Sequence, residues 1–238
     1  MCTHKPSAPH LIRMVSRWAL PVFVAIHMAA QPPDPLADAF ARMDKIAAQF
    51  KAVTADIKRD VYTVIINDHE NGLGNIKAKR DKSHDTRMLI EFTSPESRIL
   101  AIDGTSAEVY TPTLKTVQQV DIKKGLVDQF LLLGFGASAA ELKEHYTVTF
   151  IGIEKLDSET TWHLLLVPKS PEVLKNLKKA ELWLGQTSGL PVQEKLFTSS
   201  TGDYQLYIYS NVKLNPPLSD GAVKLKYPNG VTVEHPRL

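Results

Sequence analysis

Cysteine is almost absent from this sequence, because its 238 residues contain only Cys2. Cys2 lies in an N-terminal segment that we expect to be removed, so the mature chain would hold no cysteine at all. That composition excludes thiol catalysis and cysteine-bound zinc, and it is compatible with an oxidising compartment in which the protein forms no disulfide.

Recognisable catalytic motifs are also missing. The stretch from Gly104 to Glu108 lacks the second glycine of a nucleophile elbow, which argues against a lipid esterase. Gly134-Phe135-Gly136 has neither the lysine nor the spacing of a phosphate-binding loop. The histidines of the body of the chain are isolated, with no pair at metal spacing: His69, His84, His145 and His163. We therefore expect no enzymatic activity, no metal and no cofactor.

Residues 1–30 have the layout of a secretory signal peptide. Arg13 and Arg17 precede a short apolar run from Trp18 to Ala30, which is interrupted by Pro21 and ends in small residues. An uncleaved anchor is the alternative, but the run is shorter than the roughly 20 apolar residues that span a bilayer. We predict a signal peptide over residues 1–30, a single domain over residues 31–238, and export to the periplasm.

Charge argues against a nucleic-acid partner. The whole chain has a formal charge of +2, and removal of residues 1–30 takes away Lys5, Arg13 and Arg17 without any acid, which leaves −1. The slight basicity of the chain therefore belongs to its export signal and not to a nucleic-acid-binding face.

One amphipathic helix is predicted near the start of the domain. Asp34 is placed to cap it, and Pro35 occupies its first position. Apolar residues then recur every three or four positions, which gives the helix one apolar face: Leu36, Phe40, Met43, Ala47 and Phe50.

Beyond Val53 the apolar period becomes two, which predicts strands with one polar face and so an antiparallel sheet. Turns are expected at Asn71–Asn75 and at Asp103-Gly104, the second being a strong hairpin signal. Further strands are predicted over residues 53–66, 76–79, 87–92, 99–102, 108–111, 115–122, 146–153, 162–167, 180–184, 190–197, 204–212, 223–227 and 231–234.

A dense apolar run from Leu126 to Phe135 interrupts this pattern and predicts a central helix. Ser138 and Glu141 then form a capping-box pattern for a further, short helix through Glu144. The glycines around Phe135 are open to two interpretations: a flexible break after an apolar helix, or a hinge beneath a movable lid. A sheet of so many strands must curl, and helices from two places in the chain could lie over its concave face.

The order of these elements resembles the periplasmic lipoprotein carrier (LolA-like) family. The resemblance covers nearly all of residues 31–238 and begins with the helix at Leu36–Phe50. It continues through short motifs in matching order: Gly74-Asn75-Ile76-Lys77, Lys79-Arg80, Arg87 to Phe92, Ser94-Pro95, Ile102-Asp103-Gly104, Tyr110-Thr111-Pro112, Ser188-Gly189-Leu190-Pro191, Ser210-Asn211 and Tyr227-Pro228-Asn229-Gly230-Val231.

The resemblance implies a mainly β (α+β) fold, in which a curled antiparallel sheet forms an incomplete, half-open β-barrel with helices covering its concave face. It also implies a monomeric periplasmic carrier. Such a carrier takes acylated lipoproteins from an inner-membrane ABC-type release complex to an outer-membrane receptor. Met88 replaces the usual aromatic residue, and Pro168–Lys178 is unusually rich in lysine. A carrier of free lipid or glycolipid, or an envelope-stress sensor of the same fold, therefore stays an alternative. Such sensors usually carry a further C-terminal domain.

Site residues follow from the apolar run, the strand alternation and the helix. We predict that an acyl-chain cavity is lined by Phe40, Met43, Met88, Ile90, Phe92, Leu131, Leu132, Leu133 and Phe135. The resemblance further implies an arginine on a concave-face strand that holds the lid. Arg87 is the best match for it and Arg80 the second.

Overall fold

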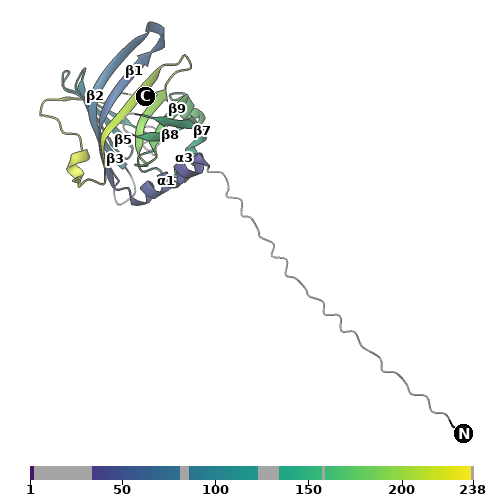
Figure 1. Ribbon diagram of the computed structural model, residues 1–238. Coiled ribbons are helices and arrows are strands. Elements are labelled where there is room, and N and C mark those ends of the chain that lie inside the picture. The colour runs from purple at the N-terminus through teal and green to yellow at the C-terminus, as the bar shows by residue number, and fades with distance from the viewer. Residues whose placement is uncertain (3–33, 81–85, 123–133, 157–158, 237–238) are drawn as a thin grey trace. The chain divides into compact units, whose positions relative to one another are not determined.

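The structure is a computed structural model, and it describes residues 1–2, 34–80, 86–122, 134–156 and 159–236. The folded unit extends from Pro33 to Leu238 and is drawn in Figure 1. The predicted signal peptide (apart from residues 1–2), the run Leu126–Leu133 and therefore the predicted central helix lie outside the described residues. No helix in the described ranges is long and apolar enough to cross a membrane.

Twelve strands of the described residues form one sheet, in the order β12-β6-β5-β4-β3-β2-β1-β11-β10-β9-β8-β7. Their bounds are β1 (Ala52–Thr63), β2 (Asp68–Arg80), β3 (Thr86–Ser94), β4 (Arg98–Asp103), β5 (Ser106–Thr111), β6 (Thr116–Asp121), β7 (Tyr146–Lys155), β8 (Thr160–Pro168), β9 (Lys179–Gly185), β10 (Pro191–Phe197), β11 (Tyr204–Leu214) and β12 (Thr232–Glu234).

The sheet is curled but not closed, because β7 and β12 stand at opposite ends of the strand order. Neighbouring strands pair antiparallel, except that β12 runs parallel to β6. The predicted fold class, a mainly β half-open barrel, is therefore confirmed. The Asp103-Gly104 hairpin is also present, with Gly104 at φ +62 between β4 and β5.

The described helices are α1 (Pro35–Gln49), α3 (Ala139–His145) and α4 (Pro171–Leu174), and short 3-10 turns occur at η1 (Val64–Ile66) and η2 (Asp220–Val223). Both predicted caps are confirmed. The Asp34 carboxylate accepts from the Leu36 amide at 3.0 Å, and Ser138 and Glu141 form a reciprocal capping box. α1 and α3 lie beside one another against the β7–β8 part of the sheet (Figure 1).

The predicted turn at Asn71–Asn75 is wrong. These residues lie inside β2, and the chain reverses instead through η1, where Asn67 takes the left-handed conformation at φ 47. A Cβ on Gly74 would stand 2.4 Å from the Glu91 carbonyl oxygen. That glycine therefore permits close backbone approach to β3 and marks no turn.

Two strand predictions also need correction. The first strand ends at Thr63, because Val64–Ile66 form η1. The segment predicted as strand 223–227 makes no ladder in the described structure. Val223 belongs to η2, which packs on β2 and β3, where Lys79 Nζ donates to the Leu218 carbonyl at 2.8 Å. Alternation at 223–227 thus reflects side-chain packing and not strand pairing.

Most of the buried apolar residues form two clusters on one face of the sheet, which we call the inner face. The first cluster lies under β1–β4 and β11 and includes Ile57, Ile76 and Met88. The second lies under β7–β10, where Leu164 and Leu182 pack with residues of α1, α3 and the segment after β8. The opposite side of the sheet is the outer face.

Candidate functional site

Strand β3 supplies the central residues of the inner face. Met88, Ile90 and Phe92 alternate along it, and their exposed fractions are 0%, 4% and 8%. All three belong to the first cluster, together with Phe50 just after α1. The structure therefore brings the three β3 residues predicted for the cavity into one apolar layer.

Phe135 joins the same layer from a distant part of the chain. Its ring is 1% exposed and meets Tyr209 of β11 edge-on, with 4.9 Å between the ring centroids. Gly136 has φ +75, and a Cβ there would stand 2.4 Å from the Phe50 ring. A side chain at this position would therefore collide with the helix end. The Gly-Phe-Gly stretch is packed onto the inner face and is not a loose break.

The two candidate arginines lie on opposite faces of the sheet. Arg80 Nη2 donates to the Gly136 carbonyl at 3.1 Å, and its guanidinium lies 5.1 Å from the centre of the Phe50 ring. Arg87 pairs on the outer face, where its Nε contacts Asp103 at 2.9 Å. The second-choice arginine therefore contacts the Gly-Phe-Gly stretch, whereas a lid-holding role for Arg87 stays a prediction that its outer-face position does not favour.

The helix residues predicted for the cavity fall in the second cluster. Met43 is 1% exposed there, and Phe40 packs at its margin with Lys143 Nζ 4.6 Å above its ring. Leu131, Leu132 and Leu133 lie outside the described residues. The predicted lining is thus divided: four residues share the first cluster and two belong to the second.

A buried carboxyl group that sequence reasoning missed lies on the inner face. Glu194 of β10 is 1% exposed, and its Oε2 accepts a hydrogen bond from the Tyr209 hydroxyl at 3.1 Å. Its Oε1 has no hydrogen-bond partner in the described structure. Burial raises the pKa of Glu194 well above its usual value, so the folded protein favours the neutral acid.

Glu194 begins a row of larger polar side chains across the inner face. It pairs with Tyr207 of β11, which in turn pairs with Arg59 of β1. Burial raises the pKa of Tyr207 to about 12. Arg59 lies 4.6 Å from the Phe92 ring centre and donates to Glu70 at 2.7 Å. The alternation Val192-Glu194-Leu196 contained this signal, since it places a carboxyl at an inward position.

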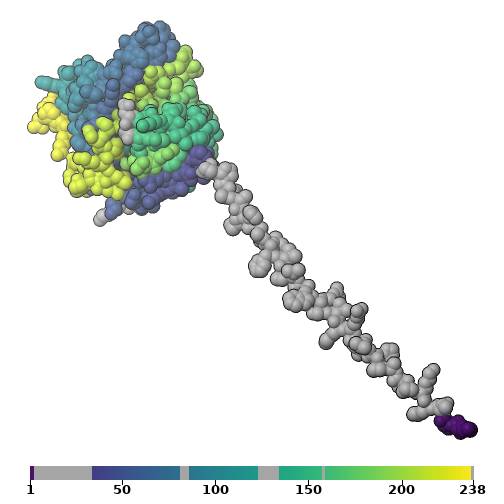
Figure 2. Space-filling view, in the orientation of Figure 1, coloured from purple at the N-terminus to yellow at the C-terminus, as the bar shows by residue number. Residues whose placement is uncertain are grey.

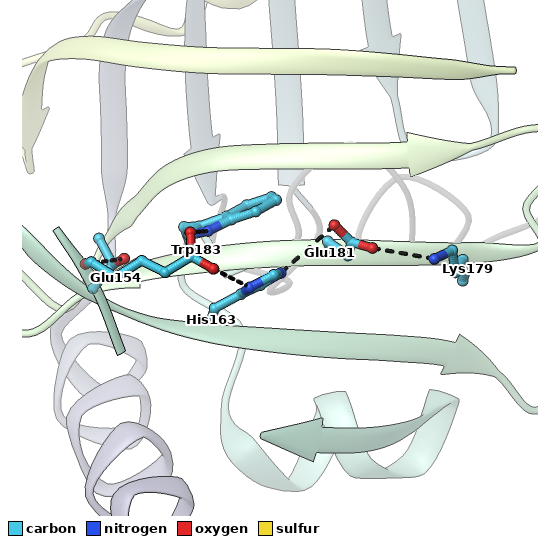
Figure 3. Close-up of polar contacts among 6 residues, drawn as sticks. Glu154, His163, Lys179, Glu181 and Trp183 are labelled. Carbon is cyan, nitrogen blue, oxygen red and sulfur yellow. Dashed lines mark hydrogen bonds and ion pairs between the residues drawn. The ribbon is translucent and has the colours of Figure 1, made fainter. Parts of the chain in front are cut away.

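The outer face carries a second polar group, drawn in Figure 3. His163 stacks on Trp183 with 4.1 Å between ring centroids, and its Nδ1 lies 2.7 Å from Glu154. The Trp183 indole N–H donates to the same carboxylate at 2.8 Å, and this hydrogen bond is the main cause that lowers the pKa of Glu154. Glu181 and Lys179 extend the group along β9. These contacts join β7, β8 and β9.

The chemistry available at the inner face is mainly apolar. Within the described ranges, no three His, Cys, Asp or Glu residues gather in a way that could hold a metal ion. A hollow of about 590 Å³ lies along β1, β2 and β11 and is lined by Thr54, Ala55, Asp56, Asn75, Ile76, Lys77, Asn211, Val212 and Lys213. None of the residues predicted for the acyl cavity lines that hollow.

Comparison with known proteins supports the fold. No protein-family model matches the chain, and no curated protein matches its sequence. An uncharacterized conserved protein from Thermus thermophilus is similar in structure, with a TM-score of 0.55 and 13% identity, over 85% of this chain and 100% of that one.

Two further structures are less similar. MucB has a TM-score of 0.49 and 11% identity, over 80% of this chain and 62% of MucB. The LolA superfamily protein NE2245 from Nitrosomonas europaea has a TM-score of 0.42 and 14% identity, over 79% of this chain and 97% of that one. The half-open sheet with helices on its inner face is the architecture that the resemblance found in the sequence implies.

Proposed function

We propose that this protein is a periplasmic carrier that shelters acyl chains between the inner face of its sheet and the Gly134-Phe135-Gly136 stretch. The cargo would be acylated lipoproteins on the way from the inner to the outer membrane. Loading by an inner-membrane ABC-type complex and unloading by an outer-membrane receptor belong to the same proposal. Free lipid or glycolipid is the alternative cargo.

One observation carries this proposal. Met88, Ile90 and Phe92 from one strand and Phe135 from a segment more than forty residues away form a single apolar layer. Two close contacts hold Phe135 there. Its ring packs against Tyr209, and the neighbouring Gly136 packs against the Phe50 ring. Displacing one side chain that a short segment holds against the sheet rearranges less of the fold than moving a helix off its core.

Binding requires this layer to open. A buried methylene is worth about 0.8 kcal/mol, so an acyl chain that replaces Phe135 gains several kcal/mol over water. Opening breaks few polar contacts among the described residues. They include the bond from Arg80 to the Gly136 carbonyl and the 2.7 Å bond from the Ala139 amide to Asp44 of α1. Both lie at the rim of the Gly-Phe-Gly stretch, where rupture leaves their groups accessible to water.

Native mass spectrometry of the protein purified from its own periplasm tests the proposal. A bound lipid-modified protein is the expected result, and bound free lipid selects the alternative cargo. Recovery without any acylated ligand, combined with failure to bind a fluorescent fatty-acid probe, would contradict the carrier function in either form.

A pair of variants tests whether the acyl chain binds in the first cluster. Ile90→Thr puts a hydroxyl into the proposed contact surface, and we expect the affinity for a fluorescent fatty-acid probe to fall at least about fivefold. Leu166→Thr puts a hydroxyl into the second cluster and serves as the matched control, because Leu166 is 0% exposed. Thermal unfolding of both variants verifies that they fold. Equal loss of affinity in the two variants would contradict this placement.

A further inference from the structure

Two of the three most exposed large apolar side chains among the described residues of the folded unit are adjacent at one end of the sheet, and the third is Leu114 (72%) in the turn between β5 and β6. Ile65 and Ile66 occupy the β1–β2 turn with exposed fractions of 82% and 68%. The turn projects from that end of the unit, as Figures 1 and 2 show. The ladder between β2 and β3 begins at Leu73 and Ser94, so the residues from Asp68 to Gly72 reach past the end of β3.

This projecting turn is held rigidly in spite of its exposure. The Asp203 carboxylate of the β10–β11 turn accepts from the Val64 amide at 2.8 Å, and the Asn67 amide donates to the Val64 carbonyl at 3.1 Å. The Tyr62 hydroxyl donates to the Asn67 side chain at 3.0 Å. Backbone amides satisfied within the protein are what an element needs in order to enter a medium without water.

An aromatic row crosses the outer face directly behind the turn. His69, Tyr62, Tyr204 and Phe197 are successive cross-strand partners on β2, β1, β11 and β10. The centroid distances along the row are 4.5 Å, 5.1 Å and 6.1 Å. Tyrosine rings, with an apolar body and a polar tip, favour the interface between acyl chains and head groups, and this row holds two of them.

Two lysines lie beside the rings of the aromatic row. Lys195 Nζ lies 3.9 Å from the Tyr204 ring centre, and Lys179 Nζ lies 4.1 Å from that of Phe197. From the turn inward, the outer-face side chains therefore change from aliphatic at Ile65 and Ile66 to the aromatic row, with two lysines beside its rings. A phospholipid monolayer changes from acyl chain to head group in the same order along its normal.

We propose that the β1–β2 turn docks this protein on a phospholipid bilayer, with Ile65 and Ile66 among the acyl chains and the aromatic row among the head groups. This membrane-docking surface is distinct from the inner face and does not depend on the proposed carrier function. It would hold the protein at a bilayer whatever cargo it takes.

Apolar insertion and not charge should dominate the docking. The lysines are balanced by acids at the same end, among them Asp60, which contacts His69, and Glu70, which contacts Arg59. Salt therefore has little net charge to screen here. Binding to uncharged phosphatidylcholine vesicles is expected to persist at about 0.5 M salt.

Co-sedimentation of the full-length chain with phosphatidylcholine vesicles tests the surface. The double substitution Ile65→Ser and Ile66→Ser should lower partitioning at least about tenfold. Ile153→Ser is the matched control, because Ile153 is 57% exposed near the far end of the sheet and should leave partitioning unchanged. Every variant keeps the same N-terminal segment, so differences between variants report on the turn.

A second readout is independent of that segment. In a Cys2→Ser background, an environment-sensitive fluorophore on Ile66→Cys should brighten several-fold on vesicle addition, whereas the same fluorophore on Ile153→Cys should not. Equal partitioning of the double variant together with unchanged fluorescence at position 66 would overturn the proposal. Retained fatty-acid binding by the double variant would show that docking and carrying are separate, and its loss would refute that separation.

Discussion

The two apolar clusters of the inner face differ in what covers them. The second cluster lies beneath structured elements, since Met43 of α1, Leu142 of α3 and Leu177 after α4 all pack into it. Among the described residues, the first cluster is covered by the end of α1 and by Phe135. Among the described residues, similar aliphatic side chains therefore lie beneath several helices in one half of the sheet and beneath fewer covering elements in the other.

Under the proposed carrier function, that difference would let one sheet be both stable and able to open. Side chains held by several helices and strands cannot separate without loss of much of the fold, because each makes many contacts. A cover that makes fewer packing contacts can leave its place locally, and Phe135 is such a cover as far as the described residues go. The comparison predicts different costs for equivalent truncations in the two clusters.

The largest effect is expected from truncation in the helix-covered cluster. Leu164→Ala should lower the free energy of unfolding by about 2–5 kcal/mol, because Leu164 is 0% exposed and its neighbours are fixed. Met88→Ala in the first cluster should cost less, about 1–2 kcal/mol, since Phe135 can move into the space. Urea unfolding measures both values. Equal costs would mean that the two covers are equally rigid.

A smaller change in the free energy of unfolding, this time an increase, is expected from substitution of Glu194, which lies between the two clusters. Burial raises the pKa of Glu194. The folded protein therefore keeps this proton at pH values above the usual pKa of 4.5, where the unfolded chain has lost it. Wild-type stability should then fall as pH rises above about 4.5. Glu194→Gln removes that dependence and should add about 1–3 kcal/mol at pH 8, with little change at pH 4. Urea unfolding at both pH values measures it, and a destabilised variant at pH 8 would contradict the neutral-acid assignment.

The smallest change in the free energy of unfolding is expected from substitution of Glu154 on the outer face. Glu154 has a lowered pKa because it accepts from Trp183, so its stabilising contribution is present above the usual value of 4.5 and disappears as pH falls through the lowered value. Glu154→Gln should cost about 0.5–1 kcal/mol at pH 7, a modest value because the carboxylate is partly exposed. Thermal unfolding at pH 7 and pH 3 measures it. A cost that persists at pH 3 would show a loss of packing and not of charge.

Local patterns identified much of the fold. The cap at Asp34, the capping box at Ser138 and the hairpin at Asp103-Gly104 were all predicted, because each depends on residues adjacent in the chain. The turn at Asn71–Asn75 was predicted wrongly, because glycine promotes turns and close strand approach alike. Only the neighbouring β3 backbone distinguishes these two roles of Gly74.

The candidate site was predictable in part. Alternation along β3 placed Met88, Ile90 and Phe92 on one face, and the structure adds Phe135 to them. Spacing in the sequence could not show which of Arg80 and Arg87 lies on the inner face. The pairing register of β2 against β3 decides which face each side chain takes. Glu194 and Arg59 were missed, since a charged residue in a strand is usually solvated.

By itself, the sequence determined the strand-rich class, the capped helix at Pro35–Gln49 and the absence of recognisable catalytic motifs, because these depend on composition and short-range periodicity. Tertiary structure decided which of the described apolar residues pack beneath several helices and which pack with Phe135. It also decided that His69, Tyr62, Tyr204 and Phe197 stand in one row behind two exposed isoleucines. The reason is physical: cross-strand register joins residues that lie far apart in the chain, and no local pattern encodes that register.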